Sequence, residues 1–219
     1  MAKNKIYFLL FVCVGFFVGL YFYNTQKNKP IRTLPYFDPK TDVIKKDKSH
    51  HRVPAFNFIN QNNQVVTEET VKNKVYVCDF FFTTCQSICP IMSNGLERVY
   101  KEFKTKDDFL ILSHTVNPET DSVAQLKEYA QKHGVTDLHW LFLTGNKKHL
   151  YEIARKGYLL NAEEGDGGED DFIHTQNFAL IDKERCIRGF YDGTDSAEVS
   201  RLIKDIHLLF EEYAYKEKN

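Results

Sequence analysis

The 219-residue chain has little excess charge and few cysteines, and each scarcity excludes a class of protein. Its 29 Lys and Arg residues are balanced by 30 Asp and Glu residues. Because binding to nucleic acid depends on a surplus of positive charge, we predict no nucleic-acid partner. Five cysteines in a chain of this length do not make a disulfide scaffold. The 18 Phe and 12 Tyr residues are typical of a packed sheet and argue against disorder.

The first stretch without charged residues covers residues 6–23, IYFLLFVCVGFFVGLYFY. An apolar stretch of this length is just sufficient to cross a bilayer of roughly 30 Å as a helix. The residues after Gly19 are bulky and offer no small-residue cleavage site, which favours an uncleaved anchor over a signal peptide. Cys13 follows bulky Val12, which argues against a lipoprotein. We therefore predict a short cytoplasmic segment at residues 1–5 and one transmembrane helix at residues 6–23.

Residues 24–51 are polar and contain Pro30, Pro35 and Pro39. They show no sustained periodicity, so we predict an extended tether between the anchor and a folded domain. The remaining residues, 52–219, are sufficient for one well-packed core and too few for two full domains.

Strand and helix patterns alternate through this predicted domain. The predicted strands cover residues 53–59, 64–67, 75–82, 109–116, 139–145, 172–182 and 186–193, and the predicted helices cover 90–104, 122–134, 146–157 and 196–213. The run at 75–82, VYVCDFFF, is almost continuously apolar, as in a central strand covered on both faces. This order predicts an α/β fold of the thioredoxin-like kind, with a mixed sheet flanked by helices.

The motif with the clearest chemistry is Cys85-Gln86-Ser87-Ile88-Cys89-Pro90, where the predicted strand at 75–82 leads into a helix. Pro90 suits a first helical turn. Cys89 is then at the helix N-terminus, where the helix dipole and free N–H groups favour a thiolate. Cys85 lies one turn earlier, so both sulfurs are expected to converge. Because a thiolate is both a nucleophile and a soft-metal ligand, the pair predicts either reversible disulfide formation or metal binding.

Two departures from thioredoxin chemistry favour the metal over general disulfide reduction. Three residues separate the two cysteines, whereas the thioredoxin redox motif is C-x-x-C. In addition, no proline follows Pro118, so the cis-proline with which thioredoxins hold extended substrates has no candidate in the last part of the fold.

Several segments together resemble the Sco/SenC family. They are residues 79–92 (DFFFTTCQSICPIM), residues 113–121 (SHTVNPETD), Trp140 with Leu143-Thr144-Gly145, and Ile173-His174-Thr175. The resemblance extends from about Arg52 to the C-terminal helix and includes the N-terminal anchor. It implies a thioredoxin-like protein, tethered outside the inner membrane, that binds copper and assists assembly of the dinuclear copper centre in cytochrome c oxidase subunit II.

Carried over to this chain, the resemblance implies Cys85 and Cys89 as thiolate ligands and His174 as the nitrogen ligand. Thiolates suit Cu(I), and an added imidazole lets the same site accept Cu(II). Asp79 lies six residues before Cys85 in a predicted buried strand. A buried carboxylate would have a raised pKa and could influence the protonation of the thiols, whereas a hydrogen-bonded structural Asp is the alternative. At position 117 this chain has Asn where the family often has Asp.

We therefore expect a copper metallochaperone, without turnover of a substrate, that passes copper to apo subunit II or to another copper protein. A copper donor and a thiol reductant are further expected partners, because a disulfide between Cys85 and Cys89 would prevent binding. The alternative is a thiol-disulfide oxidoreductase that reduces the cysteines of the recipient and does not need His174.

The expected location follows from this chemistry. The positive charges on the two sides of residues 6–23 do not fix the orientation. No Arg- and Ser-rich transit peptide precedes the span, which favours a bacterial protein. We expect a single pass through the bacterial inner membrane, with the C-terminal domain on the periplasmic side.

Overall fold

The computed structural model describes Tyr7, Phe11 and residues 14–21, 32–39, 50–160, 173 and 175–218. It divides into two units, one formed by residues 34–211 and one by residues 1–33 and 212–219. The described residues between 7 and 21 are helical. Among all residues described, no helix has the length and apolar character that crossing a bilayer requires. Much of the anchor predicted at residues 6–23, including Cys13, lies outside the described residues, and the anchor stays a prediction.

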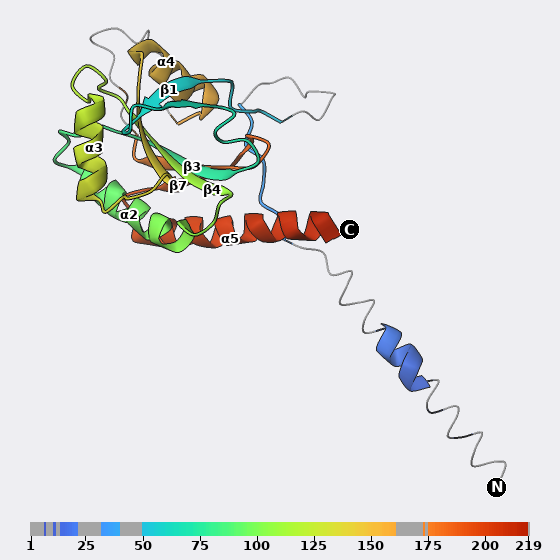
Figure 1. The fold of residues 1–219 in the computed structure, drawn as a ribbon. Helices are drawn as coiled ribbons and strands as arrows, with labels where there is room; N and C mark the ends of the chain where they lie inside the picture. Colours follow the sequence, from blue (N-terminus) through green and yellow to red (C-terminus); the bar gives the residue numbers. More distant parts are fainter. Residues whose placement is uncertain are drawn as a thin grey trace. The chain divides into compact units, whose positions relative to one another are not determined.

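Within its described residues, the larger unit forms a seven-stranded mixed sheet with the order β2-β1-β5-β4-β3-β6-β7 (Figure 1). The strands are β1 (Asn57–Asn60), β2 (Val65–Thr67), β3 (Val75–Phe81), β4 (Phe109–Thr115), β5 (Trp140–Thr144), β6 (Asn177–Ile181) and β7 (Ile187–Asp192). The central strands β3, β4 and β5 are parallel, and the outer pairs are antiparallel. The predicted mixed sheet is confirmed.

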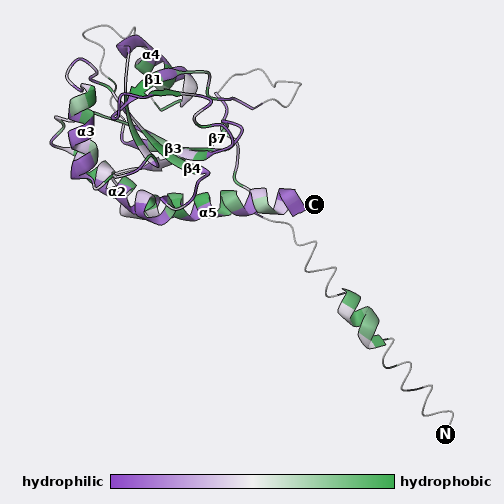
Figure 2. Ribbon diagram, viewed as in Figure 1, coloured by the Kyte–Doolittle hydropathy of each residue, from purple (hydrophilic) through white to green (hydrophobic). Residues whose placement is uncertain are grey.

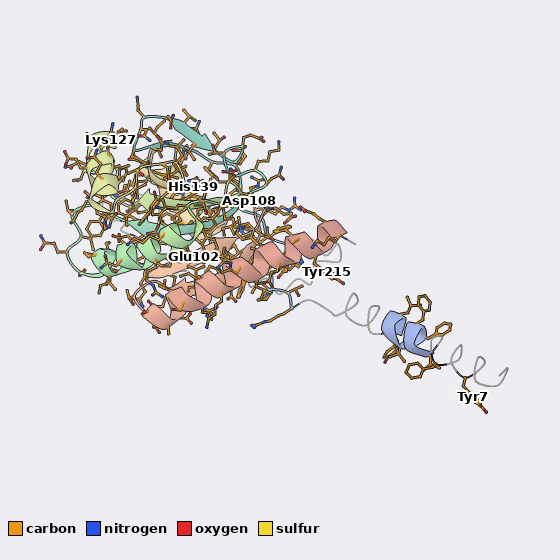
Figure 3. All side chains as sticks on the ribbon, turned by 60° about the horizontal axis from the view of Figure 1, so that its bottom comes forward. Tyr7, Glu102, Asp108, Lys127, His139 and Tyr215 are labelled. Carbon is orange, nitrogen blue, oxygen red and sulfur yellow. The ribbon has the colours of Figure 1, made fainter. Side chains whose placement is uncertain are left out.

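Helices cover both faces of this sheet (Figure 1). One face carries α2 (Ile88–Phe103), α3 (Val123–Lys132) and α5 (Ser196–Lys218), and the other carries α4 (Lys147–Glu152) with the π-helical turn η1 (Ile153–Gly157). Glu102, labelled on α2 in Figure 3, shares a hydrogen bond with His207 on α5, with 2.9 Å between Glu102 Oε1 and His207 Nε2. Gly95 allows the close approach of these two helices, because a Cβ there would lie 3.0 Å from Val199.

The first hairpin is shorter than predicted. β1 begins at Asn57 rather than at residue 53, because the Val53 N–H bonds to the Arg185 carbonyl outside the sheet ladder. The Asn-rich turn is confirmed: Asn60 Oδ1 accepts hydrogen bonds from the N–H groups two and four residues later, at 2.9 and 3.0 Å. Asn63 has a positive φ of 58°, which Asn tolerates better than most residues.

The two central strands β3 and β4 are buried along their whole length, and Figure 2 shows apolar residues concentrated in the sheet. Successive side chains of a strand point to opposite faces. Asp79 on β3 is paired in register with Ser113 on β4, and the next pair is Phe80 with His114. Asp79 and Ser113 therefore share one face of the sheet, whereas His114 points to the other, where α4 and η1 lie.

Part of the predicted tether contacts the domain. The Phe37 N–H donates to the Ile187 carbonyl at 3.0 Å. Arg188, itself buried, donates to the carbonyls of Leu34 and Pro35 at 2.6 and 3.0 Å, and its guanidinium lies 4.2 Å from the centre of the Tyr36 ring. Residues 34–37 of the predicted tether therefore contact the domain, and the domain boundary at residue 52 stays a prediction. The sequence concealed this because carbonyl contacts with a buried Arg produce no periodic pattern.

Candidate metal centre

The two cysteines of the C-x-x-x-C motif meet at the start of α2. The helix begins at Ile88, so Cys89 lies in its first turn and Cys85 in the loop before it. The Cys89 N–H donates to Cys85 Sγ at 3.4 Å, and Cys85 Sγ lies 3.7 Å from Ser87 Oγ. All four cysteines among the described residues are free thiols. The arrangement is a reduced dithiol, open to metal binding or to oxidation.

The two thiols differ in acidity. The sequence predicted that the helix N-terminus would favour a thiolate at Cys89, but Cys89 is the less acidic of the two. Burial raises the pKa of Cys89 to about 12, and its hydrogen bond to Cys85 adds to this. Burial also opposes ionisation of Cys85, but hydrogen bonds from the Cys89 thiol and N–H and from Ser87 outweigh it and lower the pKa of Cys85. The helix N-terminus does stabilise a thiolate, but its N–H points at Cys85 Sγ rather than at the Cys89 sulfur. Cys85 is therefore the more acidic thiol.

A buried carboxylate, Asp121, fixes the loop that carries Cys85. Asp121 is fully buried and accepts hydrogen bonds from the Thr83 N–H at 3.2 and 3.3 Å and from the Thr83 hydroxyl. It also accepts one from the hydroxyl of Thr115, at the end of β4. Thr83 is only two residues from Cys85, so Asp121 ties the thiol loop to the core. The sequence analysis assigned Asp121 no role. The available signal was its position directly before Ser122, whose hydroxyl oxygen caps the N-terminus of α3 by accepting a backbone hydrogen bond of 3.3 Å.

Asp79 lies behind the thiols on β3 and is 2% exposed. It accepts a hydrogen bond from the Ser113 hydroxyl, whose oxygen in turn accepts one from Trp140 Nε1 at 2.8 Å. Burial raises the pKa of Asp79 to about 7, although the bond from Ser113 opposes the shift. A charge on Asp79 raises the pKa of Cys89. Asp79 is thus hydrogen-bonded, as a structural Asp would be, and also electrostatically coupled to a thiol.

A hydroxyl pair that sequence reasoning missed lies near the same place. The Ser93 and Tyr129 hydroxyls are 2.9 Å apart and buried between α2 and α3. Burial raises the pKa of Tyr129 to about 12, and charges on Cys89 and Asp79 add to the shift. The Ser93 and Tyr129 hydroxyls, which are neutral and hydrogen-bonded to each other, therefore lie near the dithiol.

The predicted nitrogen ligand, His174, lies outside the described residues. Its neighbour Ile173 is buried, and β6 begins at Asn177. Because β6 is antiparallel to β3, the chain enters β6 at the end of β3 from which the thiol loop departs. Among the residues that the structure does describe, no three or more His, Cys, Asp or Glu side chains are grouped to hold a metal ion. The described part thus provides two candidate ligands, Cys85 and Cys89.

Comparisons with known proteins agree with this fold and motif. The SCO1/SenC family model matches residues 44–211. The SCO1 protein homolog of Bacillus subtilis (strain 168) is 32% identical over 163 residues, which are 74% of this chain and 84% of the relative. The structure of BsSco, described as a member of the Sco family of cytochrome c oxidase assembly proteins with a disulfide switch, has a TM-score of 0.61 and 31% identity, and the match covers 72% of this chain and 92% of BsSco.

A SCO1/SenC family lipoprotein from Bacillus anthracis str. Ames has a TM-score of 0.64 and 25% identity, with 82% of this chain and 99% of that chain covered. The fold is therefore the predicted thioredoxin-like α/β fold, with a dithiol at the start of α2. The chain belongs to the SCO1/SenC family.

Proposed function

We propose that this protein is a copper metallochaperone. It binds copper through Cys85, Cys89 and His174 and assists assembly of the dinuclear copper centre of cytochrome c oxidase subunit II. The observation that carries the proposal is the reduced dithiol at the start of α2, with the Cys89 N–H directed at Cys85 Sγ. Membership of the family, and the assembly role stated for BsSco, support the recipient.

The chemistry of the donor set fits copper. Two thiolates are soft ligands that suit Cu(I), and an imidazole extends the site to Cu(II). The path of the chain into β6, three residues after His174, supports this histidine as the third ligand. Metal binding must displace the thiol protons, and the low pKa of Cys85 makes it the first ligand to ionise. The Cys89 proton leaves only as copper replaces it, because burial holds the pKa of that thiol at about 12.

The proposal includes a membrane location. Residues 6–23 anchor the protein in the bacterial inner membrane, and the domain lies on the periplasmic side, where it meets subunit II or another apo copper protein. The description of the Bacillus anthracis relative as a lipoprotein supports membrane attachment in the family. A copper donor and a thiol reductant act before transfer, because oxidised cysteines cannot bind copper.

A second candidate function is reduction of the recipient's cysteines by thiol-disulfide exchange. The unequal thiols favour it: an acidic, partly exposed Cys85 beside a buried Cys89 suits an attacking and a resolving cysteine. The disulfide switch described for BsSco supports it also. This function does not use His174, and that difference separates the two candidates.

The deciding experiment is an anaerobic Cu(I) titration of the reduced full-length protein in detergent against a competing chelator. We expect the parent to bind one equivalent tightly, and Cys85→Ala, Cys89→Ala and His174→Ala each to weaken binding by tenfold or more, about 1.4 kcal/mol. His149→Ala removes an exposed histidine on α4 and is the matched control. If His174→Ala binds copper as tightly as the parent while the dithiol exchanges rapidly, the oxidoreductase function is the better account.

A further inference from the structure

Three polar side chains in the core lack a hydrogen-bond partner. They are Tyr76 on β3, His114 on β4 and Tyr158, the residue after η1, and each is 0% exposed. Within the described part of the chain, neither hydroxyl and neither ring nitrogen of His114 has a partner at normal hydrogen-bond geometry. Weaker interactions remain between the two tyrosine hydroxyls and between His114 and the backbone of Asp79 and Leu112. Buried polar groups in native proteins are nearly always satisfied by protein atoms or ordered water, so these four atoms need an explanation.

The four atoms lie within one small region of the core. The ring centres of His114 and Tyr158 are 5.3 Å apart, and those of Tyr76 and Tyr158 are 6.3 Å apart. Phe80 stacks on the His114 ring at 5.0 Å, and Phe58 meets it edge-on at 5.5 Å. Aromatic walls therefore enclose the polar atoms on the face of the sheet opposite the thiols.

The turn around Tyr158 holds its side chain in this region. The Tyr158 N–H donates to the Ile153 carbonyl at 2.7 Å, and the Leu160 N–H donates to the Ala154 carbonyl at 3.0 Å. Between them, Leu159 has a φ of 56°, a conformation that is costly for a residue with a Cβ. The strained conformation of Leu159 therefore occurs in the turn that places the Tyr158 side chain in the core, beside His114.

The available groups match a neutral ligand that both donates and accepts hydrogen bonds. Burial lowers the pKa of His114 to about 4, so its imidazole is neutral, with one donor and one acceptor nitrogen. Burial raises the pKa of both tyrosines well above the ordinary value, so both keep their hydroxyl protons.

We propose that Tyr76, His114 and Tyr158 form an internal water-binding site between the sheet and η1. Water supplies two donors and accepts two hydrogen bonds, and buried waters typically make about three hydrogen bonds to otherwise unsatisfied groups. The two hydroxyls and one of the two ring nitrogens, which point in different directions, offer three partners to a single water. The site lies on the other face of the sheet from Cys85 and Cys89, and it does not depend on copper binding.

The sign of a stability change tests the proposal. If water satisfies the hydroxyls, Tyr76→Phe and Tyr158→Phe each remove a hydrogen bond, and the urea midpoint of the full-length protein in detergent falls. If the hydroxyls truly lack partners, the same variants remove a desolvated polar group, and the midpoint rises. Tyr151→Phe is the matched control, because the Tyr151 hydroxyl donates directly to the Val116 carbonyl at 2.8 Å and its loss must lower the midpoint.

A crystal structure of the full-length protein completes the test. Ordered water within hydrogen-bond distance of at least two of the three side chains, together with lowered midpoints, supports the site. Raised midpoints in both variants overturn it. Lowered midpoints with His114 bonded directly to a tyrosine hydroxyl, and no water between them, overturn it as well.

Discussion

The buried polar residues on the two faces of the central sheet differ in their hydrogen bonding. On the face covered by α2 and α3, Asp79 is hydrogen-bonded to Ser113, and Ser113 to Trp140. On the opposite face, His114 follows Ser113 directly in β4, and its ring nitrogens have no partner at normal hydrogen-bond geometry among the described residues. The first face positions groups for chemistry at the thiols, whereas the second encloses neutral groups among aromatic rings.

Burial favours the neutral form on both faces but moves the two pKa values in opposite directions. It raises the pKa of Asp79 to about 7 and lowers that of His114 to about 4. The same desolvation therefore keeps a proton on the acid and removes one from the base. What distinguishes the thiol face is its hydrogen bonds, because they lower the pKa of Cys85 despite burial.

The largest predicted effect is the unequal reactivity of the two thiols. The pKa of Cys89 is raised to about 12, whereas that of Cys85 is lowered below the ordinary value for a thiol. At neutral pH, the thiolate fraction of Cys85 should therefore exceed that of Cys89 by roughly a thousandfold. The weaker nucleophilicity of a more acidic thiolate reduces the preference in labelling rate to at least about thirtyfold. Iodoacetamide labelling of the reduced, copper-free protein, followed by peptide mass spectrometry, measures both rates.

Two controls sharpen this comparison. Ser87→Ala removes one hydrogen bond to Cys85 and should slow the labelling of that thiol. Ser93→Ala removes a hydroxyl bonded to Tyr129 instead and should leave the Cys85 rate near that of the parent. Equal labelling of Cys85 and Cys89 in the parent would contradict the assignment of the acidic thiol.

The second effect is the pH dependence of stability. The unfolded state protonates histidine below about pH 6.5, but folded His114 does so only below about pH 4, so this residue makes stability rise by about 3 kcal/mol across that window. Folded Asp79 keeps its proton up to about pH 7, but the unfolded state loses it near pH 4, so stability falls by about 4 kcal/mol as pH rises. The two contributions oppose each other in the parent.

Single substitutions separate the two contributions. His114→Gln should leave a stability that falls more steeply as pH rises from about 4 to 6.5, and Asp79→Asn should leave one that rises more steeply. Urea unfolding of the full-length protein at several pH values in this range measures both slopes. A slope for His114→Gln that matches the parent would mean that His114 is not held neutral by burial.

The sequence was sufficient for the fold because its main signals are local. The apolar run of β3, the Asn-rich turn and the Pro90 helix start each depend on neighbouring residues, and each was confirmed. The acidity of the thiols was predicted wrongly because it depends on where a single N–H points. The contacts of residues 34–36 with the domain were not predicted, because their partner, Arg188, lies far along the chain.

The side-chain contacts between neighbouring strands could not be predicted from the sequence either. The pattern of β4 makes Ser113 and His114 look alike, as polar residues in an apolar strand. Only the pairing of β4 with β3 shows that Ser113 is hydrogen-bonded to Asp79, whereas His114 packs among aromatic side chains. Candidate ligands could be predicted from the motif, but the groups that control them could not.

The smallest of the three effects concerns Asp121. Asp121→Ala leaves the Thr83 and Thr115 hydroxyls and the Thr83 N–H without their acceptor, which should cost about 2 kcal/mol of stability after partial rearrangement. Because Thr83 is two residues from Cys85, the same change should loosen the thiol loop and weaken Cu(I) binding. Urea unfolding and the competitive Cu(I) titration measure the two losses in one protein.

A comparison with Asp137→Ala shows whether Asp121 acts on the thiols or only on the fold. Asp137 also accepts hydrogen bonds, from the Tyr100 hydroxyl and the His139 N–H, but it contacts no residue of the thiol loop in the described structure. Both variants should lose stability, whereas only Asp121→Ala should also lose copper affinity and change the Cys85 labelling rate. Equal losses of copper affinity would place Asp121 among general structural residues, because a positioning role requires an effect at Cys85 beyond that of an unrelated, hydrogen-bonded carboxylate.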